Sequence, residues 1–249
     1  MRPRSNSLFH FTNHEKFLFD ILESGFWPRY CLEDIIWQDF KKFEFIAFPM
    51  VCFCDVPLSR ITEHTEHYGS YGVGLKKEWA ERNTLNPVLY ISPKSGLRES
   101  ILRSMDFAAR TCSDIEKSDS NKELDENRFL VSHIKPTKGI MLKNENKMYR
   151  DFYQESEWRY IPRNPSVATH LVHSEFNDAV KIDFHNRQSK KYCSLKITPI
   201  DIAYIFVPTD SDIPKIIKFI QNNLRSFSQN DLMILYSRIV SIETLQGDM

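Results

Sequence analysis

Two carboxylates and an arginine within the sequence ESEWR have the types and spacing to do chemistry. In an extended chain, residues two apart point to the same face, so Glu155 and Glu157 would share one face. Trp158 and Tyr160 would share the other face and pack on a core. This pattern predicts a turn that feeds a strand and offers acid groups to a cleft. The alternative is an amphipathic edge strand whose glutamates are simply exposed to solvent.

A second group of residues has the types that bind zinc. Cys52 and Cys54 form a C-x-C pair, and His64 and His67 form an H-x-x-H pair. Their spacing does not match the paired ligands of known zinc sites, and free cysteine is a common filler of buried strands. We therefore expect no bound metal.

The first elements expected along the chain position several of these residues. Residues 7–12 alternate like a strand that carries His10 and Thr12, and a helix then follows Asn13 and stops at Gly25. Residues 47–56 are apolar enough for a buried strand. Residues 68–75, YGSYGVGL, predict a turn and a short strand whose glycines permit positive φ and close backbone approach.

The remaining pattern predicts one α+β domain over residues 1–249, with a mainly antiparallel or mixed sheet flanked by helices. Residues 26–45 are expected to form a covering loop with a short helix, and the polar residues 118–126 a flexible surface loop. Further helices are expected at 57–67, 76–82, 96–114 and from 212 onward. Further strands are expected at 87–92, 157–162, 179–184, 194–198 and 203–207.

Composition limits the class of protein. Lysine plus arginine equal aspartate plus glutamate at 33 each, which argues against a main partner that is bulk nucleic acid or an anionic membrane. The five cysteines are irregularly spaced, as in a reduced protein, and no run approaches the roughly 20 apolar residues of a membrane helix. We expect a soluble, cytoplasmic protein.

Much of the chain resembles the AbiGi group of abortive-infection, or phage-resistance, proteins. The segments that carry this resemblance are SNSLFHFT, FPMVCFCDVPLSRI, HYGSYGVGLKKEWA, NPVLYIS and ESEWRYIP. They span roughly positions 5 to 162, and the resemblance fades after Pro162. It implies a two-component system with a toxin or other defence partner. Members of this group are often labelled antitoxins.

The same order of motifs is more loosely similar to bacterial ADP-ribosyltransferase-like proteins of the His-Tyr-Glu variety. The resemblance implies that fold, NAD as cofactor, and a set of site residues. The matching residues are His10 and Thr12, then Tyr68 or Tyr71, then Glu157 with Glu155 upstream. No Ser-Thr-Ser triplet is present, which separates the chain from the other variety.

The resemblance also implies a role for each residue. Glu157, with Glu155 beside it, would stabilise the oxocarbenium-like charge that forms when the nicotinamide–ribose bond breaks. His10, with Thr12, would bind the ribose, and Tyr68 or Tyr71 would stack on nicotinamide. Arg159 would pair with the pyrophosphate, or alternatively with a carboxylate of the protein itself. A carboxylate facing a cleft is not core, so Glu157→Gln should leave folding unchanged.

Two functions follow from these patterns. The first is an NAD-using ADP-ribosyltransferase that modifies an unidentified macromolecule during phage infection, with the site residues converging on one pocket. The second is a non-catalytic antitoxin or regulatory component that binds and restrains a toxin partner. Nucleic-acid binding is disfavoured by the neutral charge.

Overall fold

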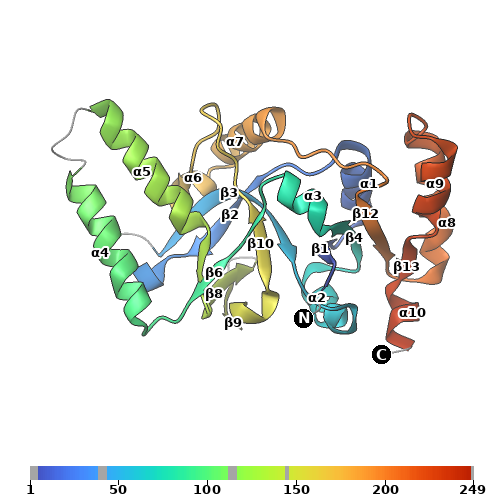
Figure 1. Cartoon of the computed structure of the whole chain (residues 1–249), viewed down its shortest axis with the longest axis horizontal. Helices are drawn as coiled ribbons and strands as arrows, with labels where there is room; N and C mark the ends of the chain where they lie inside the picture. Colours follow the sequence, from blue (N-terminus) through green and yellow to red (C-terminus); the bar gives the residue numbers. More distant parts are fainter. Residues whose placement is uncertain (1–4, 39–43, 112–116, 144–145, 248–249) are drawn as a thin grey trace. The chain divides into compact units, whose positions relative to one another are not determined.

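The structure, a computed structural model, describes residues 5–38, 44–111, 117–143 and 146–247. The chain divides into two compact units, which we describe separately. Unit 1 contains residues 1–26, 52–85 and 195–249, and unit 2 contains residues 27–51 and 86–194. Figure 1 shows the elements along the chain. The expectation of a single domain over residues 1–249 stays a prediction.

Unit 1 is built on a mixed, mostly antiparallel sheet. Its strands are β1 (Ser7–Thr12), β4 (Tyr71–Lys76), β12 (Ile202–Val207) and β13 (Ile239–Ser241). Strand β4 pairs antiparallel with β1 and with β12, and β12 pairs parallel with β13. Several helices contact these strands: α1 (Glu15–Ser24), α2 (Ile61–Tyr68), α3 (Lys77–Arg82), α8 (Ile213–Asn223) and α10 (Ile242–Gly247). Helix α9 (Gln229–Tyr236) contacts α8.

The glycines of β4 make room for two aromatic rings. In the β1–β4 register, Phe9 lies opposite Gly74 and Phe11 lies opposite Gly72. A Cβ built on Gly72 would lie 2.6 Å from the Phe11 ring, and one built on Gly74 would lie 2.9 Å from the Phe9 ring. The positive φ expected for this segment occurs at Gly69, which ends α2 at φ 102°. Close approach of side chains, rather than backbone strain, therefore explains the two glycines of β4.

Those rings belong to the core of unit 1. Phe9 and Phe11 pack with Phe206, and Cys54 of β3 (Phe45–Cys54) lies in the same cluster, as do Val56, Ile61 and Ile242. This cluster is entirely apolar, so its stability comes from surface removed from water and from close packing.

Unit 2 contains a second antiparallel arrangement. Residues 45–51 of β3 pair with β2 (Arg29–Asp34) and β11 (Leu171–Val172), while β10 (Glu157–Tyr160) pairs with β5 (Asn86–Pro87). Strands β6 (Leu89–Ile91) and β7 (Ile134–Pro136) pair in parallel, and β8 (Lys138–Lys143) and β9 (Asn146–Asp151) form an antiparallel pair.

The helices of unit 2 complete an α+β fold. They are α4 (Gly96–Thr111), α5 (Lys117–Ser132), α6 (His173–Phe176) and α7 (Ala179–Tyr192), with 3-10 turns η1 (Ile36–Gln38) and η3 (Phe152–Glu155). An α+β fold with a mixed, mostly antiparallel sheet flanked by helices is thus confirmed. The ADP-ribosyltransferase-like fold stays a prediction.

Four sequence-based assignments are wrong. The segment expected as a covering loop with a short helix does contain a short helical turn, η1, but it also contains strand β2, which forms because β3 supplies its hydrogen-bonding partner; residues 39–43 lie outside the described part. The expected flexible loop at 118–126 lies within α5, which packs on α4. The expected strand at 179–184 is helix α7, which Asp178 caps by accepting the backbone N–H groups of Val180 and Lys181. Residues 194–198 form an isolated bridge, Phe26 to Leu195, instead of a strand.

The expected helix at 96–114 is found as α4, which the structure follows to Thr111; residues 112–114 lie outside the described part. None of the described helices is both long and apolar enough to cross a membrane.

Candidate functional site

The ESEWR segment is oriented opposite to the prediction. Glu157 and Arg159 lie on the buried face of β10, whereas Trp158 and Tyr160 are half-buried. Glu155 is not in an extended segment, because it ends the 3-10 turn η3. Ser156, at φ 45°, links this turn to the strand. The predicted shared face of a strand is therefore wrong, although both carboxylates do meet at a third residue, Lys135.

Arg159 is enclosed by hydrogen-bond acceptors. Its side chain is 0% exposed, and its Nε donates to Glu157 Oε1 at 2.7 Å. Nη2 donates to Glu157 Oε2 at 3.1 Å and to Glu33 Oε2 at 2.7 Å. Nη1 donates to the backbone carbonyl of Ser132 at 2.7 Å. The pairing with Glu157 is bidentate, which is the strong geometry for an arginine and a carboxylate.

Lys135 joins the two predicted carboxylates. Its buried Nζ donates to Glu155 Oε2 at 3.0 Å and to Glu157 Oε2 at 2.9 Å, and it lies 4.3 Å from the centre of the Phe152 ring. Burial alone would lower the pKa of Lys135, but the carboxylates of Glu157, Glu33 and Glu155 together raise that pKa well above its ordinary value. Lys135 is therefore held as a cation.

We call Glu33, Lys135, Glu155, Glu157 and Arg159 the buried charge cluster. They come from β2, β7, η3 and β10 of unit 2, so the cluster ties four elements together. Removing water from such charges is costly, and a single missing partner leaves another charge uncompensated. The alternative role predicted for Arg159, a pair with a carboxylate of the protein, is the one that the structure shows.

The other predicted site residues lie in unit 1. Thr12 stands directly opposite Tyr71 in the β1–β4 register, and His10 stands opposite Val73. Because side chains alternate along a strand, His10 and Thr12 share a face that Phe9 and Phe11 do not. The structure thus brings Thr12 and Tyr71 together, with His10 one step along on the same face.

His10 is a half-buried strand residue with a defined partner. Its Nδ1 lies 2.8 Å from the carbonyl oxygen of Cys52, to which it donates. Its ring packs against Phe26 and Phe53, with centroids 5.1 and 5.5 Å away. A hydrogen-bonded, ring-packed histidine has a sufficient structural reason to be here.

The two predicted tyrosines differ in setting. Tyr68 is exposed at the end of α2, with its ring centroid 6.2 Å from that of His64. Burial raises the pKa of Tyr71, and the nearby carboxylates of Asp212 and Glu15 raise it further. Since these residues belong to unit 1 and Glu155, Glu157 and Arg159 belong to unit 2, their convergence on one pocket stays a prediction.

The C-x-C pair lies on β3 and the H-x-x-H pair lies on α2. Among the described residues, no group of three or more histidine, cysteine or acidic side chains is arranged to hold a metal. The expectation of no bound metal stays a prediction.

Comparison with known proteins agrees with the resemblance seen in the sequence. Residues 24–208 match the family model described as "Putative abortive phage resistance protein AbiGi, antitoxin". The chain is also 27% identical over 247 residues to the "Abortive phage resistance protein AbiGi" of Lactococcus lactis subsp. cremoris, covering 90% of this chain and 99% of that protein. No solved structure matches. The expected fading after Pro162 is wrong, because the family match continues through α7 and β12. The chain belongs to the AbiGi family of abortive phage resistance proteins.

Proposed function

We propose that this chain is the antitoxin of an abortive-infection system, and that it restrains a toxin partner by forming a stoichiometric complex with it. In this account the chain does no chemistry on the partner. The family description, which covers residues 24–208 and includes the word antitoxin, supports this proposal.

The observation that carries the proposal is the state of Glu157. A carboxylate that stabilises a developing positive charge must present an oxygen to the reacting centre. Oε1 of Glu157 accepts from Arg159, and Oε2 accepts from both Lys135 and Arg159. Both oxygens are thus engaged inside the protein.

The same geometry argues against NAD binding by Arg159. A pyrophosphate would need an accessible guanidinium edge, whereas Nε, Nη1 and Nη2 of this fully buried side chain all donate within unit 2. In this arrangement Arg159 and Glu157 do not fit the cofactor, so we derive no NAD-dependent step.

The second candidate is the NAD-using ADP-ribosyltransferase that acts on a macromolecular target. One observation favours it: Thr12, Tyr71 and His10 lie on the same face of the β1–β4 pair, in the order that the resemblance implies. This candidate requires rearrangement of the buried charge cluster when NAD binds.

Co-expression tests the two candidates. The chain is expressed together with a candidate toxin, defined as a product of a neighbouring gene that arrests growth when expressed alone. Wild type is compared with Tyr71→Phe, which removes only a hydroxyl from a half-buried ring. The antitoxin proposal expects equal rescue of growth by both forms and no ADP-ribose on cellular macromolecules. Loss of rescue by a normally folded Tyr71→Phe protein, together with loss of an ADP-ribose signal seen for wild type, would favour the transferase.

A further inference from the structure

We propose that the outward face of α7 is the surface that binds the partner, and that it fits an acidic protein surface with an apolar pocket. This inference rests on the proposed antitoxin function. We call the face the α7 stripe, and its residues are Val180, Phe184, Arg187 and Lys191.

The inward face of α7 is fixed by contacts within unit 2. Ile182 packs on the cluster that contains Tyr30 and Leu171. Asn186 Oδ1 accepts the backbone N–H of Tyr30 at 3.2 Å, and Ser189 Oγ donates to the carbonyl of Pro28 at 2.6 Å. These contacts settle which side of the helix is buried.

The α7 stripe lies on the opposite side. A helix turns about 100° per residue, so Phe184 and Lys191 lie roughly 200° and 180° around the axis from Ile182. Val180 is 78% exposed and Phe184 is 51% exposed. Two large apolar residues four positions apart thus form neighbouring points on the helix surface, with two cations continuing the line.

The charge around the stripe has one dominant sign. Helix α7 carries four cations, Lys181, Arg187, Lys190 and Lys191, against one carboxylate, Asp183. Asp183 pairs with Arg187 at 2.8 Å, so the excess positive charge of the helix comes from its three lysines. Trp27 and Arg29 lie beside Lys190 of α7, because the guanidinium of Arg29 lies 4.6 Å and the ammonium of Lys190 5.7 Å from the centre of the Trp27 ring. The whole chain is neutral, so this local excess is not a property of its composition. A complementary partner surface is acidic.

The apolar residues favour a protein over a nucleic acid. Lys190 and Lys191 at the end of the helix are explained in part by the helix dipole, which favours cations there. That effect does not explain Val180 and Phe184 near the beginning. Phosphate contacts give a duplex interface its affinity, and an apolar side chain adds nothing to contacts with phosphate, whereas apolar anchors in pockets dominate protein interfaces.

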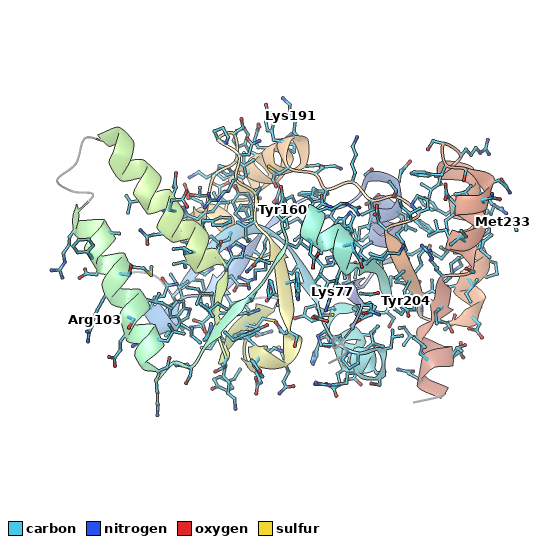
Figure 2. All side chains as sticks on the ribbon, viewed as in Figure 1. Lys77, Arg103, Tyr160, Lys191, Tyr204 and Met233 are labelled. Atoms are coloured by element: carbon cyan, nitrogen blue, oxygen red, sulfur yellow. The ribbon has the colours of Figure 1, made fainter. Side chains whose placement is uncertain are left out.

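A second exposed apolar pair supplies a matched control. Met233 and Ile234 on α9 are 60% and 48% exposed, but α9 has no lysine or arginine. They also lie outside the residues that match the family model, whereas α7 lies inside them. Figure 2 labels Lys191 on α7 and Met233 on α9, each on the outer surface of its helix.

The test titrates the purified full chain with the purified candidate toxin that co-expression identifies. Calorimetry measures the affinity, and stopped-flow kinetics measure the association rate. Phe184→Ala is expected to weaken binding about tenfold or more, as for an interface anchor, and Met233→Ala less than about twofold. The double variant Lys190→Gln, Lys191→Gln should slow association at low salt and have little effect at high salt. All variants should have the melting temperature of the wild type, since the altered side chains are exposed.

Several results would overturn the inference. If Phe184→Ala binds the partner as tightly as the wild type does, the inference about the α7 stripe is wrong and the antitoxin proposal still holds. If the wild type does not bind the partner, the antitoxin proposal itself is wrong. Loss of self-association on Phe184→Ala, with partner binding unchanged, would assign the stripe to a second copy of this chain. Competition of a DNA or RNA duplex for the stripe would assign it to nucleic acid.

Discussion

The aromatic core of unit 1 and the buried charge cluster of unit 2 both involve strands that carry predicted site residues, but they stabilise the protein differently. In unit 1, Phe9, Phe11 and Phe206 pack against one another, so losing one contact leaves a void without an unpaired charge. In unit 2, the inward residues of β10 are ions. Removing one ion leaves others uncompensated at low dielectric. Polar residues in a strand are thus not evidence of a site by themselves, because partners inside the fold can account for them.

The largest effect is expected from Arg159→Met. It leaves Glu157 and Glu33 without their buried guanidinium and should lower the free energy of unfolding by about 3–5 kcal/mol. Urea denaturation measures this. Arg103→Met is the control, because Arg103 is an exposed residue of α4 (Figure 2), 3.8 Å from Glu99 on the same helix, and should change stability by less than about 0.5 kcal/mol. Equal effects of the two substitutions would contradict the structural role of the cluster.

Glu157→Gln should destabilise by about 1.5–3 kcal/mol, the range for hydrogen bonds to charged groups. The amide keeps the size of the side chain but removes the charge that faces Arg159 and Lys135. The sequence-based expectation that folding would be unchanged is replaced by this one, because Glu157 is buried. Glu155→Gln weakens the contact to Lys135 at 3.0 Å and the longer ion pair to Arg150 at 4.0 Å, and should cost less than the loss of the bidentate pair with Arg159. Thermal unfolding of the two variants measures which one is less stable. A lower stability of Glu155→Gln than of Glu157→Gln would contradict the placement of Glu157 at the centre of the buried charge cluster.

In unit 1 the corresponding substitution is Gly72→Ala. The added methyl would meet the Phe11 ring at 2.6 Å and the carbonyl oxygen of His10 at 2.7 Å. Overpacking of this kind typically costs about 1–3 kcal/mol. Gly96→Ala is the control, since nothing lies within 4 Å of its built Cβ. A Gly72→Ala protein as stable as wild type would show that β1 and β4 are less tightly packed than described.

The smallest expected effect is the pH dependence of stability, to which one residue of each unit contributes at opposite ends of the pH range. The folded-state pKa of Lys135 is raised, so its contribution is fully present below the unfolded value of about 10.4 and is lost as pH rises through the folded value. In unit 1, burial alone would raise the pKa of Asp201, but hydrogen bonds from Thr198 and Arg82 lower it. That contribution is present above about pH 3.9 and is lost as pH falls through the folded value.

Melting temperature measured from acid to alkaline pH should show both limbs. Lys135→Met should make the alkaline limb less steep and leave the acid one, while Asp201→Asn should make the acid limb less steep. Part of the alkaline limb should remain, because burial also raises the pKa of Tyr30 and of Tyr90. An alkaline slope unchanged by Lys135→Met would contradict the contribution assigned to Lys135.

Local signals predicted much of the fold. β1, α1, β3, β4, β12 and α8 all occur where alternation, helical spacing or a terminating glycine indicates them. Helix α5 was misassigned because its polar sequence resembles a loop, and packing on α4 is not visible in the sequence. Strand β2 depends in the same way on its pairing with β3.

The site was predicted in type but not in environment. Glu155, Glu157 and Arg159 were identified from their spacing, yet their orientation depends on Lys135 and Glu33, which are 22 and 126 residues from their partners. Lys135 ends the sequence FLVSHIK, whose four apolar residues are a signal that the cation at its end is buried. Without such partners, the carboxylates look like solvent-facing groups of a cleft.

The central claim, restraint of a partner by binding, is tested most directly by stoichiometry. The activity of the candidate toxin that co-expression identifies is titrated with purified chain, with and without NAD, and the mass of the toxin is measured afterwards. The account predicts a breakpoint at one chain per toxin, no dependence on NAD and an unchanged toxin mass. Inhibition by far less than one equivalent that requires NAD and adds ADP-ribose to the toxin would contradict it.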